Sequence, residues 1–402
     1  MKILMICEFY DDVLEYQENL LAKYYALNGH EVTIITSTIR SIQDYYHDRD
    51  PGRGSRQEER TDHARVIRLP FRYNILHRIK IFESIANIIE EEAPDLLYFH
   101  DIIPNILEGV RYVKRHPDCA MIMDYHADIS NSGANWASRY ILHGVIRKWI
   151  LDRARPHLKK IFPIVPAGFD FLRTYYDVTD AEMELLPLGT DQDYARAVLA
   201  SDARQRIRAR LGIEESDLAI FTGGKLTPLK RTEDLLMAVN GLDDTSIHII
   251  VAGAGDPTLS DYLAVIERHS ANRPNIHMAG WQDRSGVYDL MAAADLAIFP
   301  ASQSVMWQQS LGMGLPLIVG EETELQRGVQ TVGYLNRHDN LIILDPSRPF
   351  SAQIAEHVRR LADDRARLAA MAAGARRTAA EILDYNAICT TTLRYSSAKS
   401  GI

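Results

Sequence analysis

Short apolar runs alternate with helix-length amphipathic segments along almost the whole chain, and this alternation constrains the fold more than any other feature. The first unit predicts a strand at 2–7, a helix at 17–28 that ends at Gly29, and a second strand at 31–36. Strands that are apolar throughout are buried on both faces, as in parallel sheets. Because parallel neighbours need a crossover connection, the intervening helices complete a doubly wound α/β arrangement.

The alternation occurs in two series, joined by a segment at 184–195 that contains Pro187 and Gly189. The first series adds strands at 64–69, 95–100 and 120–125 and helices at 81–92 and 102–115; the second has strands at 218–221, 247–252, 276–279, 296–300, 315–319 and 341–344. We therefore predict two Rossmann-like domains facing a cleft, at 1–188 and 189–383, with a C-terminal helix within 384–402 packing back onto the first. Residues 45–62, rich in Asp, Arg and Gly, are predicted to form a mobile loop.

Composition narrows the class of protein. A chain of 402 residues with 46% hydrophobic residues has material for roughly two to three domains. Its net charge of −9 argues against nucleic acid as a partner. No apolar run approaches the ~20 residues that a membrane span needs. Cys7, Cys119 and Cys389 lack metal-ligand spacing and fit buried thiols in a reducing compartment, so we expect a cytoplasmic protein.

Residues 221–231 read FTGGKLTPLKR, a predicted strand that enters a Gly-Gly turn before a helix. Gly223 and Gly224 let the backbone approach a ligand closely. Lys225 and Lys230 add positive charge near a helix N-terminus, where a phosphate would be held. The turn therefore favours binding of a diphosphate without a metal; the alternative is an ordinary connection of a doubly wound fold.

Further motifs occur in a fixed order: NGHEVTIIT at 28–36, PDLLYFHD at 94–101, YHAD at 125–128, LPLGTD at 186–191, AGAGDP at 252–257 and GLP at 314–316. Taken together they resemble retaining glycosyltransferases of family 4, which have the two-domain GT-B fold. The resemblance implies transfer of a sugar from a nucleotide-sugar with retained anomeric configuration. It also implies that the acceptor binds the N-terminal domain and the donor the C-terminal domain.

The resemblance assigns roles to individual residues. Lys225 and Lys230 match the basic pair that stabilises the leaving diphosphate, and His126 matches the histidine that faces the transferred sugar. The residues expected to bind the nucleotide-sugar are Gly223, Gly224, Gly253, Trp281, Ser304 and Gln309. Those expected on the acceptor side are Tyr16, Gln17, His100 and Asp128. No metal and no cofactor are expected, because the lysines supply the charge.

The chain departs from the family at two glutamates that precede the GLP motif. Gln309 stands where the second glutamate would hold the ribose, and the first has no counterpart, with Ser304 the nearest polar residue. Either the donor is held by Ser304, Gln309 and backbone amides, or the donor site has decayed. The second case would make the chain a sugar-nucleotide-binding or scaffolding partner of an active transferase. A nucleotide-sugar epimerase or a sugar phosphorylase on the same scaffold is a further alternative.

The substrates are predicted only by class. A UDP-sugar is favoured over a GDP-sugar as the donor, and the acceptor is a glycan or a lipid-linked molecule. Residues 139–160 contain the single acid Asp152 and these bases: Arg139, Arg147, Lys148, Arg153, Arg155, Lys159 and Lys160. With Trp149 and several aliphatic residues, the segment predicts a peripheral contact with the inner face of a membrane. The alternative is a solvated helix whose apolar stripe packs in the core.

Overall fold

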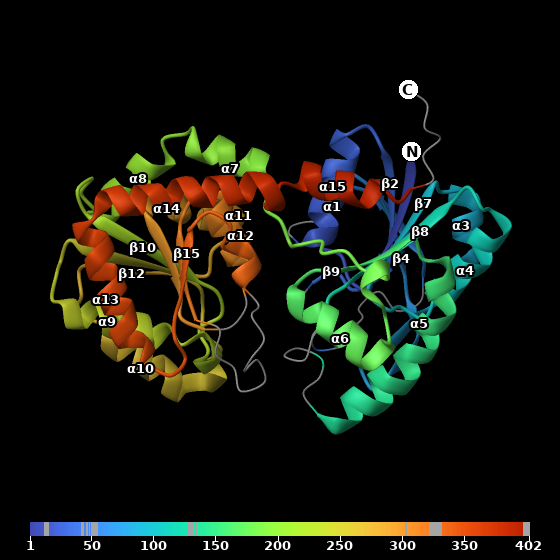
Figure 1. The fold of residues 1–402 in the computed structure, drawn as a ribbon, viewed down its shortest axis with the longest axis horizontal. Helices are drawn as coiled ribbons and strands as arrows, with labels where there is room; N and C mark the ends of the chain where they lie inside the picture. The colour runs from blue at the N-terminus through green and yellow to red at the C-terminus, as the bar shows by residue number, and fades with distance from the viewer. Residues whose placement is uncertain are drawn as a thin grey trace. The chain divides into compact units, whose positions relative to one another are not determined.

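The computed structural model describes residues 1–11, 16–41, 44–45, 47, 49, 55–127, 132, 135–301, 304–320 and 332–396. The chain divides into two compact units (Figure 1). Unit 1 comprises Met1–Leu188 and Tyr385–Ile402, and unit 2 comprises Gly189–Asp384. Each unit has a doubly wound sheet, as the sequence predicts.

The sheet of unit 1 has the strand order β3-β4-β2-β1-β7-β8-β9. The strands are β1 (Lys2–Ile6), β2 (Glu31–Ser37), β3 (Gln57–Arg60), β4 (Arg65–Leu69), β7 (Leu96–His100), β8 (Ala120–Tyr125) and β9 (Lys160–Pro163). All neighbours are parallel except β3, which pairs antiparallel with β4 at the edge. The order reverses between β1 and β7, so the carboxyl ends of these two strands form a topological switch point.

Helices cover both faces of this sheet. They are α1 (Gln17–Leu27), α3 (Ala86–Glu92), α4 (Ile106–Arg115), the π-helix η1 (Ser138–Arg147), α5 (Lys148–Ala154), α6 (Pro166–Tyr176) and α15 (Tyr385–Leu393), with short 3₁₀ turns η2 (Arg155–His157) and η3 (Asp180–Glu182). Alternate residues of β1 enter opposite cores: Ile3 and Met5 pack with α1 and α15, whereas Leu4 and Ile6 pack with α3 to α6. Because successive strand residues point to opposite faces, an entirely apolar strand is buried only if helices cover both faces of the sheet.

Two expectations for unit 1 are wrong in part. The helix predicted at 81–92 begins only at Ala86, because residues 71–82 form a hairpin of β5 (Phe71–Ile75) and β6 (Ile79–Phe82). The Glu108 carboxylate accepts hydrogen bonds from the amides of Ile85 and Ala86, at 3.0 and 2.9 Å, and so fixes the start of α3. Within the loop predicted at 45–62, residues 57–60 form strand β3.

The sheet of unit 2 is entirely parallel, with the order β12-β11-β10-β13-β14-β15. Its strands are β10 (Leu218–Gly223), β11 (Ile247–Ala252), β12 (Ile276–Gly280), β13 (Leu296–Phe299), β14 (Leu317–Val319) and β15 (Leu341–Ile343). Here the order reverses between β10 and β13. In open α/β sheets, ligands bind outside the carboxyl ends of the strands at such a reversal.

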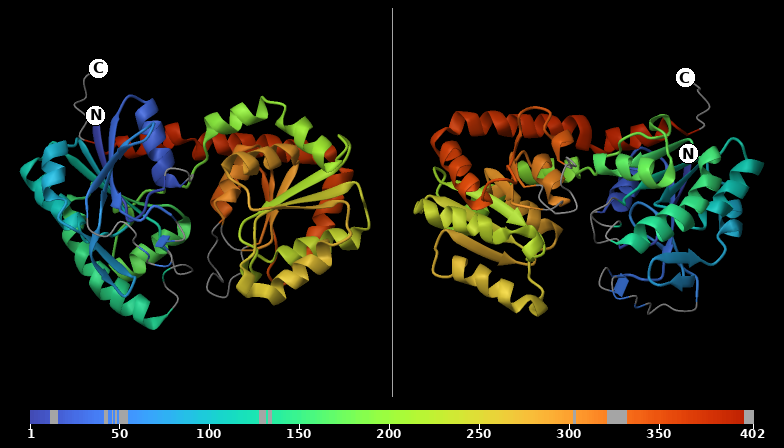
Figure 2. Two further views of the ribbon diagram at one scale, coloured as in Figure 1. Left: turned by 180° about the vertical axis from the view of Figure 1, so that it is seen from behind. Right: turned by 60° about the horizontal axis from the view of Figure 1, so that its bottom comes forward.

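Two layers of helices enclose this second sheet, as the views in Figure 2 show. The helices are α7 (Gln192–Leu199), α8 (Ala203–Leu211), α9 (Thr232–Leu242), α10 (Ser260–Ser270), α11 (Arg284–Ala293), α12 (Met306–Gly312), α13 (Phe350–Asp363), α14 (Arg365–Thr378) and η7 (Ala379–Leu383), with 3₁₀ turns η4 (Pro228–Lys230), η5 (Pro257–Leu259) and η6 (Gly333–Leu335). Leu218 and Ile220 face the layer of α9, α10 and α13, and Ala219 and Phe221 face the other.

Candidate functional site

The Gly-Gly turn after β10 is held against the end of β11. The Gly224 amide donates a hydrogen bond to the Ala252 carbonyl at 2.9 Å, and the Gly253 amide donates to the Gly280 carbonyl at 2.8 Å. A Cβ on Gly253 would lie 1.9 Å from the Gly224 carbonyl oxygen, and Gly224 itself has a φ of 118°. These two positions therefore require glycine.

The two predicted lysines follow this turn and differ in their surroundings. Lys225 is exposed, whereas Lys230 is half-buried at the end of η4, immediately before α9. Burial lowers the pKa of the Lys230 ammonium to about 8. Because a nearby anion favours the charged form of an amine, a diphosphate beside Lys230 would oppose that loss of charge.

The other predicted donor residues follow the neighbouring strands. Trp281 comes directly after β12, and its side chain is 74% exposed. Ser304 follows β13, and its hydroxyl accepts a hydrogen bond from the Met306 amide at 3.3 Å, where α12 begins. Gln309 is half-buried in α12. The donor residues therefore all come from segments after β10 to β13, at the carboxyl edge of one sheet, and Ser304 has a local structural role as well.

Unit 1 has a pocket of about 280 Å³ at its own switch point. It is lined by Cys7, Glu8, Phe9, Glu18, Tyr45, His77, Arg78, His100, Asp101, His126, Ser132 and Arg147. Glu8 lies just beyond β1, and Asp101 and His126 directly follow β7 and β8. The strand ends thus supply the polar groups of the pocket, as expected for a doubly wound sheet.

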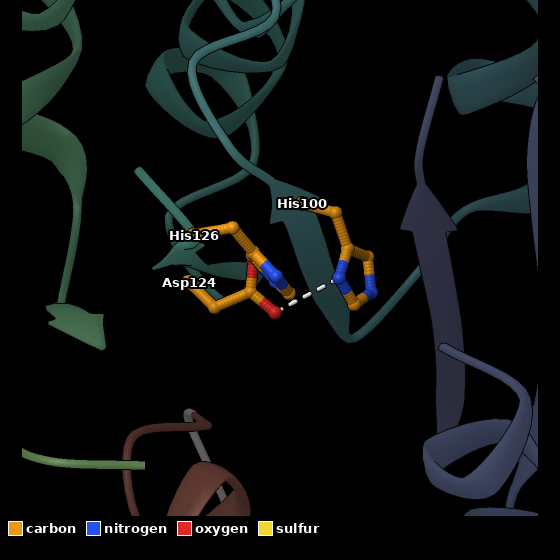
Figure 3. A group of neighbouring side chains, drawn as sticks. All are labelled: His100, Asp124 and His126. Atoms are coloured by element: carbon orange, nitrogen blue, oxygen red, sulfur yellow. Dashed lines mark ion pairs between the residues drawn. The ribbon is translucent and has the colours of Figure 1, made fainter. Parts of the chain in front are cut away.

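His100, Asp124 and His126 form a cluster beside this pocket (Figure 3). The His100 Nδ1 lies 2.8 Å from Asp124 Oδ2, and the His126 Nε2 lies 3.2 Å from Asp124 Oδ1. Burial lowers the pKa of His126, but the adjacent Asp124 carboxylate outweighs it and raises the pKa to about 9. Burial raises the pKa of Asp124, and the two imidazoles overcome this and hold it below its usual range. At neutral pH His126 is therefore an imidazolium at the pocket.

Among the described residues, these three side chains form a group that could hold a metal. One ligand atom from each lies within 4.8 Å of the others. The paired contacts of Asp124 with both imidazoles already account for this arrangement as an ion cluster. The sequence Asp191-Gln-Asp193, which superficially resembles a metal motif, has another role, because Asp191 accepts a hydrogen bond from the Tyr194 amide and pairs with Arg284 at 2.5 Å.

Sequence reasoning missed four charged residues of the pocket: Glu8, Arg78, Asp101 and Arg147. Glu8 and Asp101 follow the two central strands, so their position could have indicated them. Arg147 lies in the segment assigned to a membrane, and its guanidinium is 4.0 Å from Asp101. Burial raises the pKa of Glu8, to whose carboxylate the Tyr45 hydroxyl donates at 2.8 Å.

The remaining residues predicted on the acceptor side differ in their surroundings. Glu18 lines the pocket, but Gln17 beside it is 3% exposed, and its amide has no hydrogen-bond partner among the described residues. Tyr16 precedes the first turn of α1 and is half-buried. Asp128 lies outside the described residues. The segment at 139–160 is not one amphipathic helix, because it runs through η1, α5 and η2 into the start of β9.

Comparison with known proteins identifies the class. Residues 19–194 match the model of Glycosyltransferase Family 4. The match covers most of unit 1 and agrees with the family that the sequence motifs resemble. No protein with a curated description matches the chain by sequence.

Solved structures extend the match to both units. Sucrose-phosphate synthase from Thermosynechococcus elongatus is 14% identical, with a TM-score of 0.66 over 98% of this chain and 97% of that one. HepE from Anabaena, solved with UDP and glucose, is 15% identical, with a TM-score of 0.63 over 98% of each chain. WaaG, a glycosyltransferase involved in lipopolysaccharide biosynthesis, is 16% identical, with a TM-score of 0.61 over 99% of this chain and all of that one. At these identities the matches establish the GT-B fold.

Proposed function

We propose that this glycosyltransferase moves a sugar from a nucleoside-diphosphate sugar to a glycan or lipid-linked acceptor with retention of configuration. The observation that carries the proposal is the Gly-Gly-Lys turn, because it ends β10 at the switch point with β13 and places Lys230 shortly after Gly224, a position that requires glycine. A UDP-sugar is the favoured donor. HepE, which has the same fold, was solved with UDP and glucose.

In the proposed reaction the bond between the anomeric carbon and the diphosphate oxygen breaks, and the acceptor hydroxyl forms the new bond on the same face of the sugar. The acceptor proton leaves with the diphosphate. Lys225 and Lys230 would stabilise the negative charge that develops on the distal phosphate, and this stabilisation is larger in the transition state than in the ground state. The reaction needs no metal where two lysines supply the charge.

Unit 1 would hold the acceptor and contact the transferred sugar. His126 presents a cation at the pocket, while Glu8, Glu18 and Asp101 add acceptors for sugar hydroxyls. A carboxylate hydrogen-bonds sugar hydroxyls without a change of protonation. His100 is held against Asp124 and stacked on Tyr98 at 4.7 Å, so its role is to position the cluster.

A titration calorimetry series tests the donor site. UDP, GDP and ADP would each be added to the intact protein with and without EDTA. Binding of UDP that is indifferent to EDTA is expected.

Turnover of a Lys230 variant tests the proposed mechanism. Lys230→Ala should lower turnover on the order of 100-fold, since one preorganised contact to developing charge has about that effect. Lys114→Ala, at an exposed lysine of α4, is the control. Turnover equal in both variants would remove Lys230 from the mechanism.

One observation favours a second candidate, a sugar-nucleotide-binding partner without turnover. Gln309 lacks the charge that a glutamate would bring to the ribose hydroxyls, so its hydrogen bonds to a diol are weaker. Tight UDP binding without any product from a panel of acceptors would support this candidate. In that case Gln309→Glu should strengthen binding of UDP over 2′,3′-dideoxy-UDP, which lacks the ribose diol.

A further inference from the structure

Two neighbouring elements of unit 1 expose large apolar side chains: the β5–β6 hairpin and the helix formed by η1 and α5. Trp136 is 66% exposed, Trp149 is 51% exposed, and Leu76 at the hairpin is 83% exposed. Tyr73, Ile75, Tyr140, Ile141, Val145 and Ile146 are exposed as well. A cluster of exposed apolar side chains of this kind marks an interaction surface.

The exposed residues of the helix lie on one stripe. Trp136, in the helical turn directly before η1, and Tyr140, Val145 and Trp149 are four, five and four residues apart, which follows the turns of the π-helix and the α-helix that continues it. His143, Ile150 and Leu151 point the other way and are buried. The alternative interpretation of this segment, a solvated helix whose apolar stripe packs in the core, therefore explains the buried residues but not the exposed apolar ones.

Leu76 lies at the tip of the β5–β6 hairpin, where its side chain is exposed. The Arg78 amide donates to the Ile75 carbonyl at 3.0 Å, which leaves Leu76 and His77 as a two-residue turn. Both have positive φ, 51° and 57°, the conformation of a type I′ turn that usually contains Asn or Gly. A leucine in this strained, exposed position adds nothing to the core, so its position needs another explanation.

The hairpin and the helix meet at two arginines. The Arg147 guanidinium donates a hydrogen bond to the Arg78 carbonyl at 3.2 Å. Both arginines also line the pocket of unit 1. The exposed apolar elements therefore adjoin the pocket that the proposed function assigns to the acceptor.

The charge of the hairpin and of the η1–α5 helix indicates what kind of partner binds them. Residues 71–82 and 135–151 contain no Asp or Glu, although the chain has a net charge of −9. Arg72 and Arg78 are exposed in the first segment, and Arg139 and Lys148 are half-buried in the second. Lys80 is buried, and the Arg147 guanidinium lies 4.0 Å from Asp101, so these two add little to the surface charge. The Arg153 guanidinium lies 3.6 Å from the Trp149 ring centroid. A second copy would bring like charges together, whereas an anionic surface complements them.

We infer that the β5–β6 hairpin and the η1–α5 helix dock unit 1 onto an anionic lipid bilayer. Tryptophan, tyrosine and arginine are the side chains that favour the headgroup region, and an interfacial helix needs no membrane span. Among the described residues, no helix is long and apolar enough to cross a bilayer. Delivery of a lipid-linked acceptor to the adjacent pocket rests on the proposed function, but the docking itself does not.

Flotation with phospholipid vesicles tests the inference. The intact protein is expected to bind vesicles of phosphatidylglycerol and phosphatidylcholine more tightly than vesicles of phosphatidylcholine alone, and less tightly as salt rises. Leu76→Gln and Trp149→Gln should each weaken binding about tenfold, because each removes apolar area from the bilayer. Leu27→Gln, at a 58% exposed leucine of α1 in the same unit, is the matched control.

Three results would overturn it: no vesicle binding, equal loss in the Leu27 and Leu76 variants, or a dimer in light scattering that Leu76→Gln abolishes. The last result would identify a second copy as the occupant. Because both substituted side chains are exposed, unchanged thermal unfolding is expected and would exclude misfolding. Vesicle binding is measured without nucleotide, and UDP binding without lipid, so the docking and the transferase proposals fail separately.

Discussion

Asp124 and His126, two residues apart at the end of β8, are paired with the carboxylate Oδ1 3.2 Å from the imidazole Nε2. The other carboxylate oxygen contacts His100, so one buried acid holds two imidazoles. Burial alone would lower the pKa of His126, yet Asp124 raises it to about 9. The charge of the histidine that faces the pocket is thus set by a residue that does not line it.

Replacement of Asp124 by Asn should therefore lower the pKa of His126. With this carboxylate gone and the burial kept, the pKa is expected to fall well below about 9, while Asp101 and Glu18 still raise it. Histidine-selective NMR over pH 5 to 10 would measure it on both proteins. His126→Gln identifies the resonance. A titration that stays near 9 in Asp124→Asn would show that another group sets the charge.

The same shift makes stability depend on pH. Because the folded pKa of His126 lies above its unfolded value, its contribution is complete below about pH 6.5 and is lost as pH rises through about 9. The free energy of unfolding of the intact protein should exceed that of His126→Gln by more at pH 6 than at pH 10. Urea unfolding at the two values measures this difference. A constant difference would contradict the proposed charge state.

Lys230 has the opposite effect on the pH dependence of stability. Its pKa is lowered by burial to about 8, so the buried charge destabilises the fold below that pH and has no effect above about 10.5, where both states are neutral. A bound diphosphate would restore the proton. Binding of UDP at pH 8.5 should therefore take up protons, which calorimetry in two buffers of different ionisation enthalpy detects.

Lys230→Arg is the matched control for proton uptake. A guanidinium stays charged in this range, so UDP should bind this variant with much less proton uptake. Equal uptake in both proteins would place the titrating group elsewhere, for instance on the phosphate itself.

The fold was largely predictable because burial on both faces leaves a plain pattern. Most strands of the two parallel sheets are apolar, and the helices between them are long enough to cross over. The β5–β6 hairpin was missed because Ile79 to Phe82 also fits a helical period, and the hydrogen bond that fixes the later start of α3 comes from Glu108 in another helix. Such tertiary capping has no local signal.

The candidate site was predictable where the backbone dictates the residue. Gly253 follows from a close approach of two strand ends, and the lysines follow the Gly-Gly turn in sequence. The pocket of unit 1 was predicted in part, through its two histidines, since Glu8 and Arg78 meet there from segments about 70 residues apart, a proximity that periodicity does not show. The cluster around Asp124 likewise depends on the parallel register of β7 and β8.

The packing of α15 on α1 can be tested by a double-mutant cycle. The hydroxyls of Tyr25 and Thr392 lie 2.5 Å apart in the core of unit 1. Tyr25→Phe and Thr392→Val should each lower the free energy of unfolding, and the double variant should show a coupling of about 1 kcal/mol. Chemical unfolding monitored by fluorescence measures all four proteins. Thr390→Val, at an exposed residue of the same helix, should show no coupling with Tyr25→Phe.

A pair of glycine substitutions in unit 2 tests whether the donor turn depends on backbone contact. A Cβ on Gly253 would lie 1.9 Å from the Gly224 carbonyl oxygen, so Gly253→Ala must displace the turn that precedes Lys225. Overpacking of this kind costs roughly 1 to 3 kcal/mol of stability, and the displaced turn should lose UDP affinity as well. Calorimetry with UDP and thermal unfolding provide the two measurements.

Gly241→Ala is the control for this pair. A Cβ at Gly241 meets no atom within 4 Å, and the residue lies inside α9 of the same unit. Alanine there should stabilise the helix by about 0.5 to 1 kcal/mol and leave UDP binding unchanged. If both variants kept full UDP affinity, the close packing of Gly224 and Gly253 would be a structural feature of the sheet edge, and the diphosphate would have to bind elsewhere in unit 2.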